Sequence, residues 1–373
     1  MLPVDLPSRR ETLALGAHRG DACVSIYVET GNVTREAGAM RIAYGNAVRE
    51  AVSQLEALEL GRGRRQALAE ALDDLAEDDA FWARQARSLA VLATPERVRT
   101  FRLANRIAPT VQVSDRFHLR PLLRAIAGSQ AGFALALSEN GVRLVELFPD
   151  MPPEVVAVRD LPRDAASAVG KASINDRSHS QRIVGTEGKK VRLRQYARQV
   201  DAALREAIPA ESGPLILAAN EPLAEAFRSV ASHPDLLADN IGGEIDRMTP
   251  LQLAERARPL LDARRAAAIQ AVRALHERRA PQGRATLDIA TVARAAAFGA
   301  VETLLADMDR VVPGTLDEAT GEVAFARSEG PFSYDVLDAI ALLALASGAE
   351  VLAVRASDLP AGAPLAATLR YPV

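Results

Sequence analysis

The strongest chemical signal in the sequence is a concentration of basic side chains between residues 171 and 198. This stretch holds eight Lys or Arg residues against two acidic residues, a local charge of +6. Basic groups at this density attract the phosphates of a nucleic acid. Tyr196 is the one aromatic residue there, which favours contacts to backbone phosphates over base stacking. The residues expected to contact RNA are Lys171, Arg177, His179, Arg182, Lys189, Lys190, Arg192, Arg194 and Arg198.

The position of these charges relative to the next helix supports an anionic partner. Apolar residues recur at helical spacing over about 191–208, with Leu193, Tyr196, Val200, Ala203, Leu204 and Ala207 on one face. Lys189, Lys190 and Arg192 then lie at the start of this helix, where a cation opposes the helix dipole at a cost of about 0.3–1 kcal/mol each. A bound phosphate would reverse that effect. A solvated basic loop that balances acidic surface elsewhere remains the alternative.

Other kinds of chemistry have little support in the sequence. The five histidines lie far apart, and no nucleophile elbow, phosphate-binding glycine loop or dinucleotide fingerprint is present. The only cysteine, Cys23, lies in an expected strand, which predicts a buried and inert thiol. We therefore expect no metal and no cofactor, and a small-molecule enzyme has no motif in its favour.

Length and composition bound the remaining choices. The chain has 373 residues, a net charge of −3, 25% charged and 49% hydrophobic residues, which excludes wholesale disorder and a globally basic protein. A single cysteine favours a reducing compartment. The first residues do not read as a signal peptide, and the apolar runs fall far short of the roughly 20 residues that span a membrane. These features predict a cytoplasmic protein with no membrane partner.

The elements that must position the basic segment indicate an α/β protein of three domains. Strands at 133–137 and 142–147 flank Asn140-Gly141, which predicts a hairpin with a type I′ turn. A long helix is expected over 250–279, with a kink or break at Pro259. The expected domains are an N-terminal α/β domain at 1–128, a middle domain at 129–280 that carries the basic loop 171–198 and the connecting helix 250–279, and a C-terminal α/β domain at 281–373.

The last third alternates helices and strands and is acidic. Residues 284–373 hold six Arg and twelve Asp or Glu, a local charge of −6. Helices are expected at about 288–298 and 334–347, and strands at 301–306, 351–354 and 366–371, which predicts a largely parallel sheet. Phe325 and Phe332 are expected in the core. The net charge of −3 therefore averages two regions of opposite sign.

The same third resembles the third domain of the archaeo-eukaryotic peptide-chain release factors and their Pelota relatives. The resemblance rests on Ala295-Ala296-Ala297-Phe298-Gly299-Ala300-Val301-Glu302-Thr303-Leu304-Leu305, Tyr334-Asp335, Ser347-Gly348-Ala349-Glu350-Val351 and Ala367-Thr368-Leu369-Arg370-Tyr371. It implies a C-terminal fold of the kink-turn-binding ribosomal protein type. In the release factors this domain docks a GTPase, so a GTPase-like protein partner is expected at the acidic C-terminal domain.

The middle domain resembles the family's RNase H-like domain. Tyr196-Ala197-Arg198-Gln199-Val200 is similar to the tyrosine-x-arginine-x-valine of the family's basic helix. The family's Gly-Gly-Gln would fall at about 178–180, where this chain has Ser178-His179-Ser180-Gln181-Arg182. The resemblance makes Gln181 the candidate catalytic residue for hydrolysis of the peptidyl-tRNA ester. The missing glycines put that hydrolysis in doubt, because glycine permits close approach of the backbone to the ester.

Two functions from different classes remain at this point. The first is a release-factor-like or ribosome-rescue factor of a bacterial branch with a divergent N-terminal domain, which contacts tRNA or ribosomal RNA through the basic loop. Pelota relatives, which also lack Gly-Gly-Gln, act in rescue without hydrolysing the ester themselves. The second is a non-enzymatic protein-interaction module on a release-factor-like scaffold.

Overall fold

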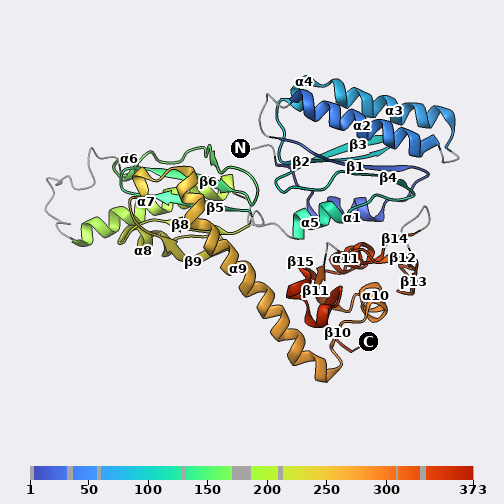
Figure 1. The fold of residues 1–373 in the computed structure, drawn as a ribbon. Coiled ribbons are helices and arrows are strands. Elements are labelled where there is room, and N and C mark those ends of the chain that lie inside the picture. Colours follow the sequence, from blue (N-terminus) through green and yellow to red (C-terminus); the bar gives the residue numbers. More distant parts are fainter. Residues whose placement is uncertain are drawn as a thin grey trace. The chain divides into compact units, whose positions relative to one another are not determined.

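The computed structural model describes residues 4–31, 37–56, 60–127, 131–169, 186–208, 213–307, 310–327 and 333–372. The chain divides into two compact units. One unit is formed by residues 130–265, and the other combines residues 2–129 with residues 266–373. The class is mixed α/β with several sheets, as predicted (Figure 1). The first and third segments have separate sheets but belong to one compact unit. The division into three domains stays a prediction.

The unit of residues 130–265 is built on one five-stranded sheet in the order β7-β6-β5-β8-β9. β5, β6 and β7 are antiparallel neighbours, whereas β8 and β9 run parallel to β5. Helix α7 covers one face, and the first half of α9 packs on the other. The elements are β5 Gly132–Leu137, β6 Val142–Leu147, β7 Glu154–Val156, α6 Ala165–Ala168, α7 Thr186–Ala207, β8 Leu215–Ala218, α8 Leu223–Arg228, β9 Leu236–Ile241, the 3₁₀ turn η2 Ile245–Arg247 and α9 Pro250–Arg279.

The β5–β6 hairpin is confirmed, but its turn differs from the expected one. Four residues, Ser138 to Gly141, join the strands, and neither Asn140 nor Gly141 has a positive φ, so the turn is not type I′. Instead, the Ser138 hydroxyl accepts hydrogen bonds from the backbone N–H groups of Asn140 and Gly141, both at 3.0 Å. A side-chain hydrogen-bond acceptor therefore stabilises this turn, and its backbone does not adopt the type I′ geometry that the Asn-Gly pair predicts.

Of the two outcomes expected at Pro259, a kink or a break, the break is wrong, since α9 runs continuously from Pro250 to Arg279. Proline removes one backbone hydrogen bond, which would have ended at Glu255 four residues earlier. Both residues are exposed, so water can satisfy the freed carbonyl. The flanking Ala257 and Leu261 are buried against the sheet, which favours a continuous helix over a break.

The N-terminal part of the other unit has an antiparallel sheet in the order β3-β2-β1-β4. Helices α2 and α3 cover one face, and α1 and α5 lie on the other (Figure 1). Cys23 in β1 is fully buried, as expected, and burial raises the pKa of its thiol to about 11. The elements are α1 Arg9–Ala17, β1 Cys23–Glu29, α2 Ala37–Glu56, α3 Arg62–Glu77, α4 Asp79–Trp82, β2 Ser88–Thr94, β3 Arg97–Leu103, β4 Thr110–Ser114 and α5 Arg120–Ala127.

In the C-terminal part of this unit, the prediction of a largely parallel sheet is wrong. In the order β10-β16-β11-β15 only β11 and β15 are parallel, because β16 returns between β10 and β11 and pairs antiparallel with both. A small sheet, β13-β12-β14, was not predicted, and Phe325 at its edge is 58% exposed rather than buried. The elements are η3 Ala280–Gln282, β10 Ala285–Thr286, α10 Ile289–Ala297, β11 Val301–Asp307, β12 Pro313–Leu316, β13 Val323–Phe325, β14 Tyr334–Asp335, α11 Val336–Ala346, β15 Glu350–Val354, η4 Ala356–Asp358, η5 Pro360–Gly362 and β16 Leu365–Leu369. Phe332 lies outside the described residues.

A half-buried carboxyl in the middle sheet gives a first prediction. Glu146 of β6 lies opposite Glu154 of β7, and burial, together with the Glu154 charge, raises the pKa of Glu146 to about 7. The pKa in the unfolded chain is about 4.3. A carboxyl whose pKa is raised by folding favours the folded state at low pH, and this stability is lost as the pH rises from about 4.3 to 7.

We therefore expect Glu146→Gln to stabilise residues 130–265 at pH 8 by about 1–2 kcal/mol and to have little effect at pH 4. Hydrogen exchange of the β5 and β6 amides, compared with wild type at each pH, measures this unit alone. Glu206→Gln, on the exposed face of α7, is the matched control and should change neither value. An equal effect of Glu146→Gln at both pH values would contradict the assignment.

Candidate nucleic-acid interface

Helix α7 packs on the middle sheet through the face that the sequence predicts. Leu193, Tyr196 and Val200 are fully buried, and Leu204 is 3% exposed. Burial of each large aliphatic side chain in such a seam contributes about 1.5–3 kcal/mol relative to exposure. The helix begins at Thr186, five residues before the expected start, so Lys189 and Lys190 lie inside it. Fixing the apolar face also fixes which side chains point to solvent.

The solvent face of α7 carries a basic stripe. Lys190, Arg194 and Arg198 are exposed and follow one another at intervals of four residues. Side chains four apart lie on one face of a helix, about 6 Å apart along its axis. Residues 188–198 contain five basic side chains and no acidic one. Like charges at this spacing repel each other by a few tenths of a kcal/mol per pair.

The other two basic residues of the helix start have different surroundings. Nζ of Lys189 lies 2.7 Å from Oε1 of Glu139 in the β5–β6 turn, so this pair ties the first turn of α7 to the hairpin. Arg192 is half-buried. Within the stripe itself, Nε of Arg194 donates to Oγ of Ser229, after α8, at 3.4 Å. The structure thus brings Lys190, Arg194 and Arg198 together and assigns Lys189 a contact within the unit.

Five of the predicted site residues lie outside the described residues: Lys171, Arg177, His179, Gln181 and Arg182. Their roles in RNA binding and the catalytic role of Gln181 therefore stay predictions. Within the described ranges, His, Cys, Asp and Glu side chains form no group of three that could coordinate a metal ion. None of the helices in the described part of the chain combines the length and apolar character needed to cross a membrane.

The structure also gathers polar residues that the sequence reasoning missed, around the β5–β6 turn. Asp246 of η2 accepts hydrogen bonds from Oγ of Ser138 and from Nδ2 of Asn140, the latter at 2.8 Å, and these bonds lower its pKa. Nη2 of Arg143 donates to the carbonyls of Ile245 and Met248 at 3.0 and 2.8 Å. In the sequence, this cluster could have been found from the run of polar residues, Ser138 to Asn140, that directly follows a buried strand.

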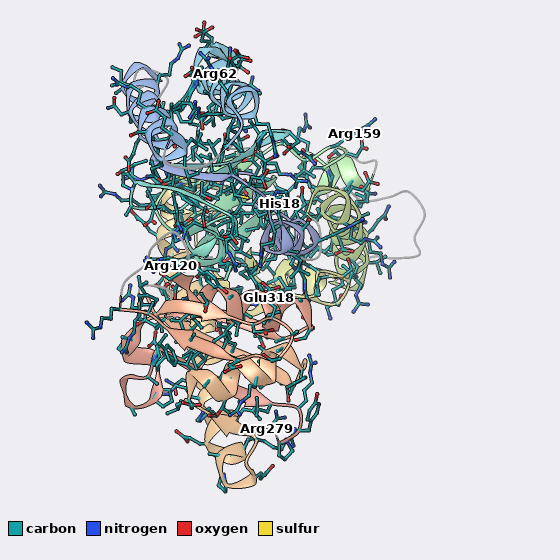
Figure 2. The ribbon with its side chains drawn as sticks, turned by 90° about the vertical axis from the view of Figure 1, so that its right-hand side faces the viewer. His18, Arg62, Arg120, Arg159, Arg279 and Glu318 are labelled. Carbon is teal, nitrogen blue, oxygen red and sulfur yellow. The ribbon has the colours of Figure 1, made fainter. Side chains whose placement is uncertain are left out.

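An open pocket of about 400 Å³ lies beside this cluster. Asn140, Arg143, Arg163 and Asp246 are its polar lining residues. Arg159 and Arg163 are strongly exposed, and Figure 2 labels Arg159 in the loop before α6. Each forms an ion pair with the aspartate that follows it, Asp160 at 3.7 Å and Asp164 at 3.0 Å, so these arginines add little net charge.

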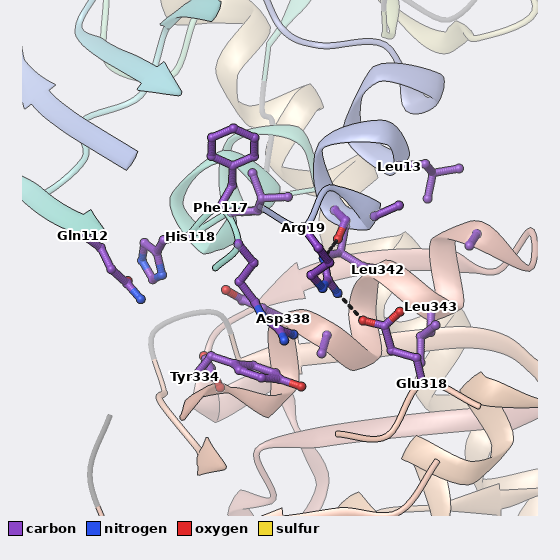
Figure 3. Close-up of a pocket in the computed structure, with 17 residues that line it drawn as sticks. Leu13, Arg19, Gln112, Phe117, His118, Glu318, Tyr334, Asp338, Leu342 and Leu343 are labelled. Carbon is purple, nitrogen blue, oxygen red and sulfur yellow. Dashed lines mark hydrogen bonds and ion pairs between the residues drawn. The ribbon is translucent and has the colours of Figure 1, made fainter. Parts of the chain in front are cut away.

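A second pocket, of about 210 Å³, lies in the other unit between α1, the loop before α5 and α11 (Figure 3). Arg19 forms an ion pair with Glu318, marked by a dashed line in Figure 3, and the guanidinium of Arg116 stacks on the ring of Tyr334 at 4.0 Å. Burial lowers the pKa of His118 to about 4, so its imidazole is neutral near pH 7. The charged groups named here already have partners within the protein.

Comparisons with known proteins agree with the sequence reasoning. Residues 129–267 match the model of bacterial archaeo-eukaryotic release factor family 11. This match covers the middle unit and agrees with the resemblance that the sequence analysis found for the middle domain. A search of the curated proteins finds no match.

Several solved structures match over much of the chain at low identity. An archaeal Pelota, solved as a model bound to the ribosome with ABCE1, is 16% identical over 77% of this chain and 78% of its own, with a TM-score of 0.43. Dom34 of S. cerevisiae is 13% identical over 77% and 79%, with a TM-score of 0.43. The archaeal translation termination factor aRF1 is 15% identical over 98% and 99%, with a TM-score of 0.25.

The ion pair between Lys189 and Glu139 gives a second prediction. Both side chains are about one-third exposed, at 37% and 30%, so solvent screens their attraction. A double-mutant cycle of Lys189→Met and Glu139→Gln should give a coupling of about 0.2–1 kcal/mol in stability, and less at 1 M salt. A coupling that is zero at low salt would show that the pair does not hold the helix start to the turn.

Proposed function

We propose that this chain is a ribosome-associated translation factor of the release-factor or rescue type, which contacts tRNA or ribosomal RNA through α7 and the basic segment before it. The observation that carries the proposal is the exposed stripe of Lys190, Arg194 and Arg198. It lies within the segment that matches the bacterial archaeo-eukaryotic release factor family. Guanidinium and ammonium groups on one helix face suit a row of backbone phosphates.

We also propose that the middle unit has the RNase H-like fold expected from the resemblance. Its strand order supports this, since three antiparallel strands, β7, β6 and β5, are extended by two strands parallel to β5. Helix α7 links β7 to β8 and covers the sheet, as a crossover between strands of one sheet must. Because Lys189 pairs with Glu139, which lies just after β5, the basic stripe begins beside the carboxyl end of β5.

A protein partner of the GTPase type is proposed for the acidic C-terminal domain, whose fold we assign to the kink-turn-binding ribosomal protein type. The charge of −6 over residues 284–373 disfavours RNA on this surface. Two aromatic side chains support a protein contact instead: Phe298 is 61% exposed and Tyr371 is 49% exposed. The Tyr371 hydroxyl donates to the carbonyl of Phe298 at 3.1 Å, so the two residues form one exposed aromatic patch.

Reversal of the stripe tests the ribosome contact. We expect Lys190→Glu, Arg194→Glu and Arg198→Glu together to abolish sedimentation with ribosomes at low salt, because binding through phosphates falls steeply when cations are lost. Wild-type sedimentation should itself weaken as salt rises. The matched control is Arg62→Glu, Arg84→Glu and Arg278→Glu, which changes the net charge equally at exposed positions elsewhere.

If the reversed stripe still sediments with ribosomes like wild type, α7 is not the contact. If wild type sediments at no salt concentration and instead captures one defined protein without ribosomal RNA, the protein-interaction module is the correct function.

Gln181 provides the test of hydrolysis. If the chain releases the peptide from peptidyl-tRNA on ribosomes, Gln181→Ala should lower the rate by about 10-fold or more, as loss of a group that orients the attacking water does. The rate should be measured with ribosome binding monitored in parallel, so that loss of binding is not read as loss of chemistry. An unchanged rate with intact binding would remove Gln181 from the mechanism.

A further inference from the structure

Strand β3 places two arginines on a face that is otherwise apolar. Side chains alternate along a strand, so Arg97 and Arg99 share their face with Phe101 and Leu103. The two latter residues are buried in the core between the sheet, α1 and α5. In the pairing with β2, Arg97 lies opposite Thr94 and Arg99 opposite Leu92. The apolar face therefore ends in two guanidinium groups beside the β2–β3 turn.

These arginines line a pocket of about 240 Å³ between β2, β3 and the end of α1. Its polar lining residues are His18, Thr94, Arg97 and Arg99, while Leu15 and Leu92 form a buried apolar floor. No carboxylate is found among the described residues that line it. A concave site that joins an apolar floor to a few convergent polar groups is typical of a ligand pocket.

Two carboxylates lie near the pocket, and each already has a cationic partner. Oε1 of Glu11 lies 3.6 Å from Nη1 of Arg99, in a pair that is partly open to solvent. Glu11 is also engaged by Ser8, whose backbone N–H donates to Oε2 at 3.0 Å and lowers the pKa of the carboxyl. A second carboxylate, that of Glu96, forms a hydrogen bond with the pocket-lining Thr94 and an ion pair with Arg64 at 2.7 Å. Arg97 is exposed, and a bound anion would contact its guanidinium group.

The pocket also offers a planar surface. The ring of His18 stacks on the ring of Phe117, with centroids 5.5 Å apart and an angle of 26° between the planes. Both residues line the pocket, and Figure 2 labels His18 at the end of α1. Aromatic and histidine rings are the surfaces on which unpaired bases stack in proteins. Guanidinium groups bind phosphate oxygens in pairs.

We infer that this pocket binds a nucleotide, with its phosphate on Arg97 and Arg99 and its base over the apolar floor beside His18 and Phe117. A free mononucleotide and one residue of an RNA strand present the same chemistry. The inference does not rest on the proposed function, because it concerns different elements and holds whether or not α7 contacts the ribosome.

Calorimetric titration of the full chain with AMP, inorganic phosphate and a hexamer of oligoadenylate at low salt tests the inference. We expect AMP to bind, and Arg97→Met with Arg99→Met to weaken it by about 10-fold or more. Arg97→Met alone, which leaves the Arg99–Glu11 pair intact, should weaken it by about threefold or more. The control variant Arg62→Met with Arg84→Met, at exposed positions outside the pocket, should bind like wild type.

The probes separate the two sources of the nucleotide. A hexamer that binds much more tightly than AMP indicates an RNA strand, whereas equal affinities indicate a free nucleotide. The inference is overturned if neither AMP nor the hexamer binds, if inorganic phosphate binds as tightly as AMP, or if AMP affinity survives in the double variant. The α7 variant with Lys190→Glu, Arg194→Glu and Arg198→Glu should keep its AMP affinity, so failure of the ribosome contact is told apart from failure of this pocket.

Discussion

The packing of α7 against the middle sheet is the constraint on which the proposed interface depends. Leu193, Tyr196, Val200 and Leu204 are buried side by side, and their burial leaves one rotation of the helix favourable about its axis. That rotation presents Lys190, Arg194 and Arg198 to solvent. A helix turned by one residue would bury a guanidinium group, at a cost far above any gain from the stripe.

In the other unit, the burial of an apolar face also fixes where charged side chains lie, but it directs them to a pocket and not to open solvent. The face of β3 that carries Phe101 and Leu103 into the core brings Arg97 and Arg99 with it, because side chains on a strand repeat every two residues. Near the strand end the guanidinium groups reach a pocket beside the end of α1 rather than the core. Such departures from an apolar pattern occur in functional sites, where local rules give way to binding.

Several elements could be read from the sequence because local patterns decide them. The apolar spacing over 193–204 gave the buried face of α7, and the alternation around Asn140 gave the β5–β6 hairpin. The predicted type I′ turn was wrong. The Ser138 hydroxyl accepts hydrogen bonds from two backbone N–H groups of the turn, and these bonds favour a different backbone geometry. A break at Pro259, one of the two expected outcomes, was also wrong, since α9 is continuous there and has buried neighbours on both sides.

The sequence by itself determined the charge separation, the α/β class, the burial of Cys23 and the resemblance to the release factors, because composition, short-range periodicity and motif order do not require knowledge of distant contacts. Only the tertiary structure decided that β16 inserts between β10 and β11, that Lys189 pairs with Glu139, and that Arg97 and Arg99 meet His18 at one pocket. Those partners lie tens of residues apart in the chain. Their meeting follows from sheet order and helix packing, which depend on how buried surfaces from distant segments fit together.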